Sequence, residues 1–376
     1  MIPFNLPAYT GNEDQYLMQS VRSSRIAGDG QFTAKCHEWF TSYFSGHKAL
    51  MTPSCTQALE MCALLIDIQP GDEVILPSYT FVSTANAFVL RGAKVVFVDI
   101  RPDTLNIDEE LIESAITVKT KAIVIVHYAG VSCEMDKIKA LADNYSLFLI
   151  EDAAQALGAK YKGKLLGTFG HMSTFSFHET KNITSGGEGG LLLFQNDTFL
   201  ERAEILREKG TNRKQFFQGK TEKYSWVDIG SSYLPSELQA AYLWGQLEKF
   251  DEICLKRMLD WNRYHQKLDT TLQPEQVEIP LIPESCEHNG HIFYLKLPDL
   301  ATRATFINHL NNNGIAATFH YVPLHSSGAG QKFGRFSGAD VFTTKESERI
   351  VRLPMFHSLN IDTQDFIIDK VTQFWS

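Results

Sequence analysis

The chain has 376 residues, of which 44% are hydrophobic and 21% are charged, and its formal net charge is -9. This length is typical of two unequal domains, and the acidic balance argues against sequence-independent binding of nucleic acid, which relies on a basic surface. No apolar run reaches the roughly 20 residues of a membrane span, and the first residues show no secretory signal. We therefore expect a soluble, cytoplasmic protein.

Short apolar runs alternate with helical stretches from Lys48 to about Phe194. Strands are expected at residues 49–54, 73–78, 94–100, 121–127 and 147–152, with amphipathic helices between them. This alternation predicts βαβ units and an α/β fold. We expect a mainly parallel, seven-stranded sheet with helices on both faces.

The alternation fades after Phe194. We expect a helix at 197–209, a polar loop at 210–220 and one long helix at about 235–268. A strand, a helix, a second strand and two final helices should then form a small α+β unit, with the two strands at 291–297 and 315–321. The predicted division is a large domain of residues 1–250 and a small C-terminal domain of residues 251–376.

Polar clusters follow several of the strand-like runs. In open parallel sheets, ligands bind at the carboxyl ends of the strands, so these clusters should converge on one site. They lie at residues 54–56, 78–81, 127–130, 152–155 and 176–181.

Lys181 and Asp152 are the most informative members of these clusters. A desolvated lysine forms a Schiff base with an aldehyde, and a buried carboxylate at a strand end needs a cationic partner such as a protonated pyridine nitrogen. Each residue alone has an ordinary explanation, because a lysine beside glycines usually lies in a solvated loop and a strand-end Asp usually forms a turn. Their combination suits pyridoxal phosphate.

A phosphate group needs backbone amides and hydroxyls, ideally at a helix N-terminus. Cys55 and Thr56 follow a strand and begin a helix, and Ser176 precedes Lys181 by five residues. Phe81 is placed to stack on a flat ring. Taken singly, these residues are more often a helix cap and a core aromatic, and the GGEGG run matches no dinucleotide motif. The six scattered cysteines show no metal-ligand spacing, so no metal site is predicted.

Three segments carry a resemblance to a known family. EDAAQALGA (151–159), FSFHETKNITSGGEGG (175–190) and LQAAYLWGQLE (238–248) resemble the DegT/DnrJ/EryC1/StrS sugar aminotransferases. The similarity extends over nearly the whole chain. It implies the aspartate-aminotransferase fold, also called pyridoxal-phosphate (PLP) fold type I.

The resemblance implies roles for particular residues. Lys181 would bear the cofactor and act as general acid and base, Asp152 would pair with the pyridinium nitrogen, and Gln155 would approach the ring's phenolic oxygen. Cys55, Thr56 and Ser176 would hold the phosphate, and Phe81 would stack on the ring.

Further roles concern the substrate and the partner subunit. The residues implied near the substrate are His178, His320 and Tyr321. In many relatives an Asn at the position of Ser232 reaches the phosphate in the partner subunit, and an Arg stands at the position of Leu234. Ser232 keeps one donor. Because that Arg is missing, we consider Arg207 and Arg213 for the anionic substrate.

The implied reaction moves an amino group from L-glutamate to C4 of dTDP-4-keto-6-deoxy-D-glucose, for a bacterial surface glycan, the enterobacterial common antigen. A homodimer with shared active sites is expected. The alternatives are another nucleotide-linked keto sugar, a product with gluco stereochemistry, a PLP-dependent sugar dehydratase, and a non-enzymatic relative. Lys181 argues against the dehydratase, because dehydratases of this family carry His there.

Overall fold

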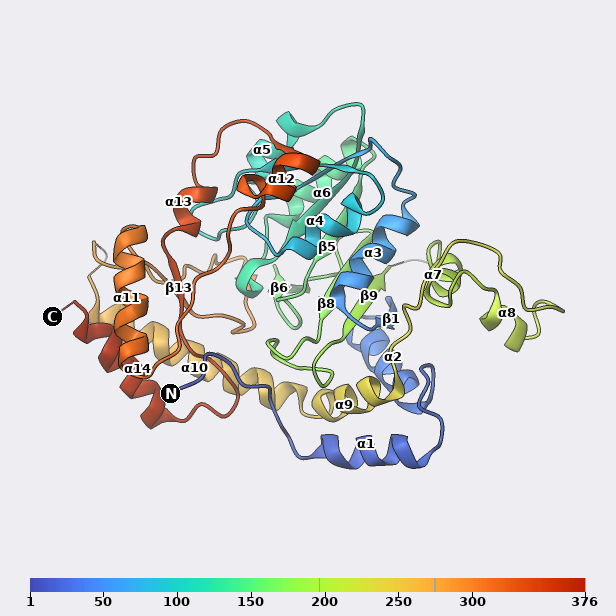
Figure 1. Ribbon diagram of the computed structural model, residues 1–376, viewed down its shortest axis with the longest axis horizontal. Coiled ribbons are helices and arrows are strands. Elements are labelled where there is room, and N and C mark those ends of the chain that lie inside the picture. The colour runs from blue at the N-terminus through green and yellow to red at the C-terminus, as the bar shows by residue number, and fades with distance from the viewer. Residues whose placement is uncertain (196, 274, 376) are drawn as a thin grey trace.

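The computed structural model describes residues 1–195, 197–273 and 275–375. An eight-stranded sheet forms its centre, in the order β1-β9-β8-β5-β4-β2-β3-β12 (Figure 1). Only β9 opposes the common direction, since it pairs antiparallel with β1 and β8 while the other neighbours are parallel. The strands are β1 (Lys48–Thr52), β2 (Glu73–Pro77), β3 (Lys94–Val98), β4 (Thr120–Val126), β5 (Phe148–Asp152), β8 (Met172–Ser176), β9 (Gly190–Phe194) and β12 (Gly334–Phe336).

The mainly parallel α/β sheet predicted from the sequence is confirmed. The eighth strand, β12, is three residues long and comes from the C-terminal part of the chain, where it pairs with β3. A segment of three residues is too short to show a strand period in the sequence, so the sheet extends one strand beyond the expected seven.

Helices cover both faces of the sheet, because successive residues of each strand point to opposite sides. Val96 and Ile123 pack on one face, and Val95 and Val124 pack on the other. The first face is covered by α2 (Gln31–Tyr43), α5 (Glu109–Ala115), α6 (Met135–Asn144) and α9 (Glu237–Leu247). The second is covered by α3 (Cys55–Leu65), α4 (Val82–Val89) and α7 (Leu200–Arg207), while α1 (Asn12–Arg22) lies along α9 (Figure 1).

The C-terminal part has its own core. Tyr264, Phe293, Leu310 and Ile367 are buried together. They come from α10 (Phe250–Thr271), α11 (Leu300–Asn312), α14 (Ile361–Gln373) and the segment before β11 (Tyr294–Lys296). β11 pairs antiparallel with β13 (Ile350–Arg352). The domain limit at residue 250 stays a prediction.

Two expectations for this part were wrong. The helix expected at 235–268 is divided into α9 and α10 by a turn at Glu248–Lys249. Residues 315–321 form no strand; Ile315 and Thr318 make single bridges, to Ile2 and Arg352 respectively. Their backbone partners belong to two different segments, which prevents a continuous ladder.

Short elements complete the fold. Residues 213–217 of the expected polar loop form a helical turn, α8 (Arg213–Phe217). The remainder are β6 (Lys160–Tyr161), β7 (Lys164–Leu165), β10 (Cys286–Glu287), α12 (Gly328–Phe333), α13 (Thr343–Ser347) and the 3-10 turns η1 (Tyr128–Gly130) and η2 (Leu324–Ser326). No helix within the described ranges combines the length and apolar composition that a membrane span requires.

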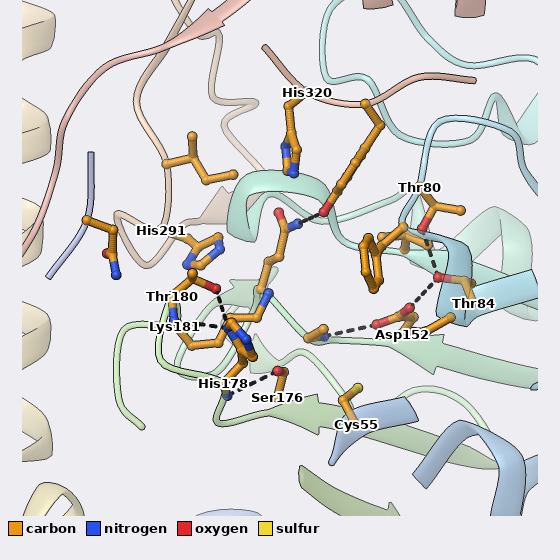
Figure 2. A pocket seen from close by; sticks show the side chains of 18 of the residues that line it. Cys55, Thr80, Thr84, Asp152, Ser176, His178, Thr180, Lys181, His291 and His320 are labelled. Carbon is orange, nitrogen blue, oxygen red and sulfur yellow. Dashed lines mark hydrogen bonds between the residues drawn. The ribbon is translucent and has the colours of Figure 1, made fainter. Parts of the chain in front are cut away.

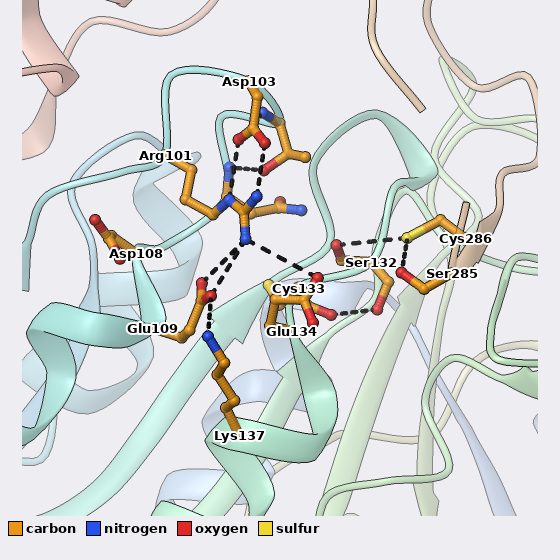
Figure 3. A network of polar contacts seen from close by, with 12 residues as sticks. Arg101, Asp103, Asp108, Glu109, Ser132, Cys133, Glu134, Lys137, Ser285 and Cys286 are labelled. Atoms are coloured by element: carbon orange, nitrogen blue, oxygen red, sulfur yellow. Dashed lines mark hydrogen bonds and ion pairs between the residues drawn. The ribbon is translucent and has the colours of Figure 1, made fainter. Parts of the chain in front are cut away.

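A polar network joins the segment after β3 to α5 and α6 (Figure 3). Arg101 binds Asp103 through two bonds of 2.9 and 2.6 Å and lies 3.2 Å from Glu109. Lys137 reaches Glu109 from α6 at 3.3 Å. Because both cations of this network are held by carboxylates, we interpret it as structural support.

Candidate active site

A cavity of about 540 Å³ opens at the carboxyl ends of β1, β2, β5 and β8, the edge at which parallel sheets bind ligands. This volume lies within the range of small-molecule sites. Residues from the C-terminal core and Phe4 and Asn5 of the N-terminal segment close the remaining sides. Four of the five predicted polar clusters contribute to the lining, those at residues 54–56, 78–81, 152–155 and 176–181, whereas no residue of 127–130 lines it.

Lys181 and Asp152 both line this cavity (Figure 2). Burial lowers the pKa of Lys181, Arg352 lowers it further, and Asp152 partly opposes the effect. A larger share of the amine is therefore neutral at physiological pH, as an amine that attacks an aldehyde must be.

Asp152 ends β5 and is held from two sides. The hydroxyl of Thr84 donates to Oδ2 at 2.7 Å, and the backbone amide of Ala154 donates to Oδ1 at 3.2 Å. Burial nevertheless raises the pKa of Asp152. The site therefore favours a cationic partner that would keep this carboxylate ionised.

Gln155 connects the large sheet to the C-terminal part. Its Oε1 accepts from the amide of Ala129 at 2.7 Å, and its Nε2 donates to the Tyr321 hydroxyl at 3.1 Å. His320 contacts the Tyr128 hydroxyl through Nδ1 at 3.1 Å, and burial lowers the pKa of His320 far below its usual value. His320 and Tyr321 both line the cavity, and His320 points into it (Figure 2).

The other end of the cavity meets the N-terminus of α3. Ser54 caps this helix by accepting from the amide of Gln57, and the first amides of the helix have no acceptor within it. The hydroxyl of Thr56 lies 2.8 Å from that of Ser83, and Ser176 faces the same region. Amides and hydroxyls at a helix N-terminus suit a phosphate group.

Phe81 and His178 lie at the mouth of the cavity. Phe81 is 56% exposed, and its ring centre is 6.3 Å from that of Tyr321, so its face is open to a ligand. His178 accepts at Nδ1 from the amide of Thr180, at 3.2 Å.

Three predicted residues lie outside this cavity. Arg207 is buried, and its guanidinium binds Asp29 at 2.6 Å and the Met51 carbonyl at 3.2 Å. Arg213 pairs with Glu208 at 3.3 Å. Neither reaches the cavity of its own chain, because each guanidinium is held by a partner elsewhere. Ser232 forms a backbone bridge with Glu208, and its contact with a partner subunit stays a prediction.

Sequence analysis missed two arginines of the cavity, Arg257 and Arg352. Arg352 ends β13, and its guanidinium lies 4.5 Å from the ring centre of Phe4. It makes no ion pair and no side-chain hydrogen bond within the described ranges, and its Nε is buried without a partner. A single arginine in the apolar run IVRLP was the signal that could have indicated it.

The residues present fit pyridoxal phosphate. Lys181 provides the amine for the aldehyde, and Asp152 provides a carboxylate for the ring nitrogen. The N-terminus of α3 provides donors for the phosphate, and Phe81 provides a ring face. These four features surround one cavity.

Comparison with known proteins gives a consistent result. The model of the DegT/DnrJ/EryC1/StrS aminotransferase family matches residues 7–372. An uncharacterised protein of Methanocaldococcus jannaschii is 37% identical, over 98% of this chain and 95% of its own.

The solved structures that are similar over almost the whole chain include those of two bacterial proteins. Spr1654 of Streptococcus pneumoniae, solved in PLP and PMP forms, is 26% identical. Its PMP form gives a TM-score of 0.89 and covers 99% of this chain and 98% of that one. PseC of Helicobacter pylori, an aminotransferase involved in pseudoaminic acid biosynthesis, gives the same identity, TM-score and coverage.

Proposed function

This chain belongs to the DegT/DnrJ/EryC1/StrS aminotransferase family, and from that premise we propose that it is a dTDP-4-amino-4,6-dideoxygalactose transaminase. It would transfer the amino group of L-glutamate to C4 of dTDP-4-keto-6-deoxy-D-glucose, giving dTDP-4-amino-4,6-dideoxy-D-galactose and 2-oxoglutarate. The product would serve a bacterial surface glycan, the enterobacterial common antigen. The observation that carries the aminotransferase activity is the convergence of Lys181, Asp152 and the N-terminus of α3 on one cavity.

Pyridoxal phosphate is the cofactor, and when bound it carries the amino group between the two substrates and takes up the electron pair left at the reacting carbon. Lys181 holds it and moves protons. In the first half of the reaction its Nζ removes the proton from Cα of L-glutamate, and in the second half it delivers a proton to C4 of the sugar. Its lowered pKa suits both tasks, because a larger share of the amine is unprotonated and can take up a proton.

The neighbouring residues bind and orient. Asp152 keeps the ring nitrogen protonated, and Thr84 fixes the direction of that carboxylate. Arg352, which has no acidic partner within the described ranges, offers paired N–H donors to a carboxylate of L-glutamate.

The test is turnover of the purified holoenzyme with L-glutamate and dTDP-4-keto-6-deoxy-D-glucose. We expect glutamate-dependent formation of the amino sugar, with couplings in the proton NMR spectrum that indicate an axial amine at C4. The variant Lys181→Ala should lose roughly a thousandfold or more in turnover.

The other outcomes separate the alternatives. An equatorial amine would indicate gluco stereochemistry, and transfer only to a different keto sugar would change the substrate. Glutamate-independent loss of a sugar hydroxyl would indicate a dehydratase. Absence of bound cofactor in the purified protein would favour a non-enzymatic relative.

A further inference from the structure

His291 is a buried histidine in the wall of the cavity that neither the cofactor nor the proton transfers require. It lies on the segment leading into β11. Arg257 holds that segment in place, because its Nε donates to the carbonyl of Gly290 at 3.1 Å and its Nη2 donates to the carbonyl of His291 at 2.6 Å. The imidazole is therefore presented to the cavity by a fixed backbone.

The proton on the His291 ring is assigned by a chain of hydrogen bonds. Nδ2 of Asn182 donates to the carbonyl oxygen of Asn289 at 2.9 Å. A carbonyl oxygen only accepts, so the other end of the amide, Oδ1, faces Nδ1 of His291 at 2.8 Å. Because Oδ1 is also only an acceptor, Nδ1 carries the ring proton. Nε2 of the neutral ring then carries none.

The surroundings keep this ring neutral. Burial lowers the pKa of His291 far below its usual value, and the charges of Lys181, Arg257 and Arg352 lower it further. Nε2 has no hydrogen-bond partner within the described ranges, and the ring lies on the Lys181 side of the cavity (Figure 2). The cavity therefore contains a hydrogen-bond acceptor that stays unprotonated.

The two substrates of the proposed reaction differ in the hydrogen-bonding groups that they present to such an acceptor. Once its amine has reacted, L-glutamate offers two carboxylates, which are acceptors when ionised and suit Arg352. A keto sugar offers hydroxyl groups, which donate. An acceptor that stays unprotonated thus discriminates in favour of the sugar.

We propose that His291 is a specificity-determining residue whose Nε2 accepts a hydrogen bond from the sugar hydroxyl next to the reacting carbon. The inference rests on the proposed function. The position follows from the wall of the cavity, in which His291 lies near Lys181, the residue whose amine must reach C4 (Figure 2). On a 4-keto-6-deoxy hexose the neighbouring hydroxyl is the one on C3.

The two half-reactions can be measured separately in the holoenzyme by stopped-flow absorbance of the bound cofactor. We expect His291→Phe to weaken apparent sugar affinity about tenfold, the effect of 1.4 kcal/mol. The glutamate half-reaction should change less than about twofold. His291→Gln, which keeps an acceptor oxygen, should recover part of the sugar affinity. Arg352→Lys should show the opposite selectivity, with the larger loss in the glutamate half-reaction.

A sugar lacking the C3 hydroxyl completes the test. The wild-type enzyme should bind this analogue about tenfold more weakly than the natural keto sugar, whereas His291→Phe should bind both equally, as a double-mutant cycle requires for a direct contact. Equal losses in both half-reactions would overturn the proposal and indicate a structural role. The proposal would also be overturned if His291→Phe still preferred the sugar that carries the C3 hydroxyl. If the wild-type enzyme reacts with glutamate but transfers the amino group to no keto sugar, the proposed function itself fails.

Discussion

The carboxylate of Asp152 shows how a single residue is adapted to a ligand. Its backbone ends a buried strand, and its two oxygens each accept one hydrogen bond, from Thr84 and from Ala154. These bonds fix its direction but do not offset burial, so its pKa remains above the usual value. In the absence of the cofactor, the ionised carboxylate therefore opposes folding.

This carboxylate predicts a pH dependence in the cofactor-free protein. A carboxyl with a raised pKa binds its proton more tightly in the folded state than in the unfolded state. The stabilisation that the protonated Asp152 gives to the folded state is fully present below the unfolded pKa of about 4. It is lost as pH rises through the folded pKa. Asp152→Asn is neutral throughout, so the melting temperature of this variant minus that of wild type should grow with pH across that window. We expect this difference in melting temperature to grow by at least about 2 °C, measured by thermal unfolding. A constant difference would contradict this account.

At the scale of elements, the proposed phosphate site depends on how closely β9 approaches α3. Gly190 begins β9, and a Cβ atom there would lie 2.5 Å from the amide nitrogen of Cys55 and even closer to the backbone of Ser54. Backbone atoms cannot swing aside as a side chain can. The absence of a side chain at Gly190 thus lets the start of α3 sit directly over the strand.

Gly190→Ala should therefore displace the N-terminus of α3. We expect destabilisation of about 1–3 kcal/mol and at least a tenfold loss of pyridoxal phosphate affinity, measured by titration of the cofactor-free protein. Gly328→Ala is the matched control, since a Cβ at that position meets no atom within 4 Å and Gly328 begins α12. Normal cofactor affinity in Gly190→Ala would show that this close approach does not position the phosphate site.

At the scale of the whole molecule, one segment extends from the body of the protein. The arm, residues 213–232, includes α8 and lies beyond the sheet (Figure 1). Its large apolar side chains are exposed, with Phe217 72% and Trp226 79% accessible. Exposed aromatic side chains on a projecting segment indicate a protein interface. The arm also ends at Ser232, the residue predicted to reach the cofactor phosphate of the partner subunit.

The arm predicts the oligomeric state. We expect a homodimer of twice the 42.4 kDa chain mass in analytical ultracentrifugation. The double variant Phe217→Ser and Trp226→Ser should shift the protein toward the monomer and weaken cofactor retention. Val118→Ser, which removes a fully exposed apolar side chain after α5, should remain dimeric. A dimeric double variant would show that the arm is not the interface.

Much of the large domain could be predicted because its signals are local. Apolar strands, polar strand ends and the residues around Lys181 follow one another along the chain. The rule that parallel strands bind ligands at one edge then places Cys55, Phe81, Asp152 and Lys181 near each other. The family resemblance added the cofactor.

The C-terminal part was harder to predict. β12 is three residues long, and residues 315–321 bond to two separate segments. The sequence of neither segment therefore shows an apolar pattern that identifies its structure. The apolar run around Arg352 singles out this arginine but does not show that it enters the cavity, whereas Arg207 is buried against Asp29.

The sequence by itself determined the mainly parallel α/β architecture and the position of Asp152, Lys181 and the start of α3 at one edge of the sheet, because each follows from the local pattern of strands and their polar ends. Only the tertiary structure decided which cations reach the cavity and which nitrogen of His291 carries the proton. Both depend on contacts between residues that are far apart in sequence, such as the hydrogen bond that Nδ1 of His291 donates to Oδ1 of Asn182. Burial, charge and hydrogen-bond direction at such contacts are set by packing.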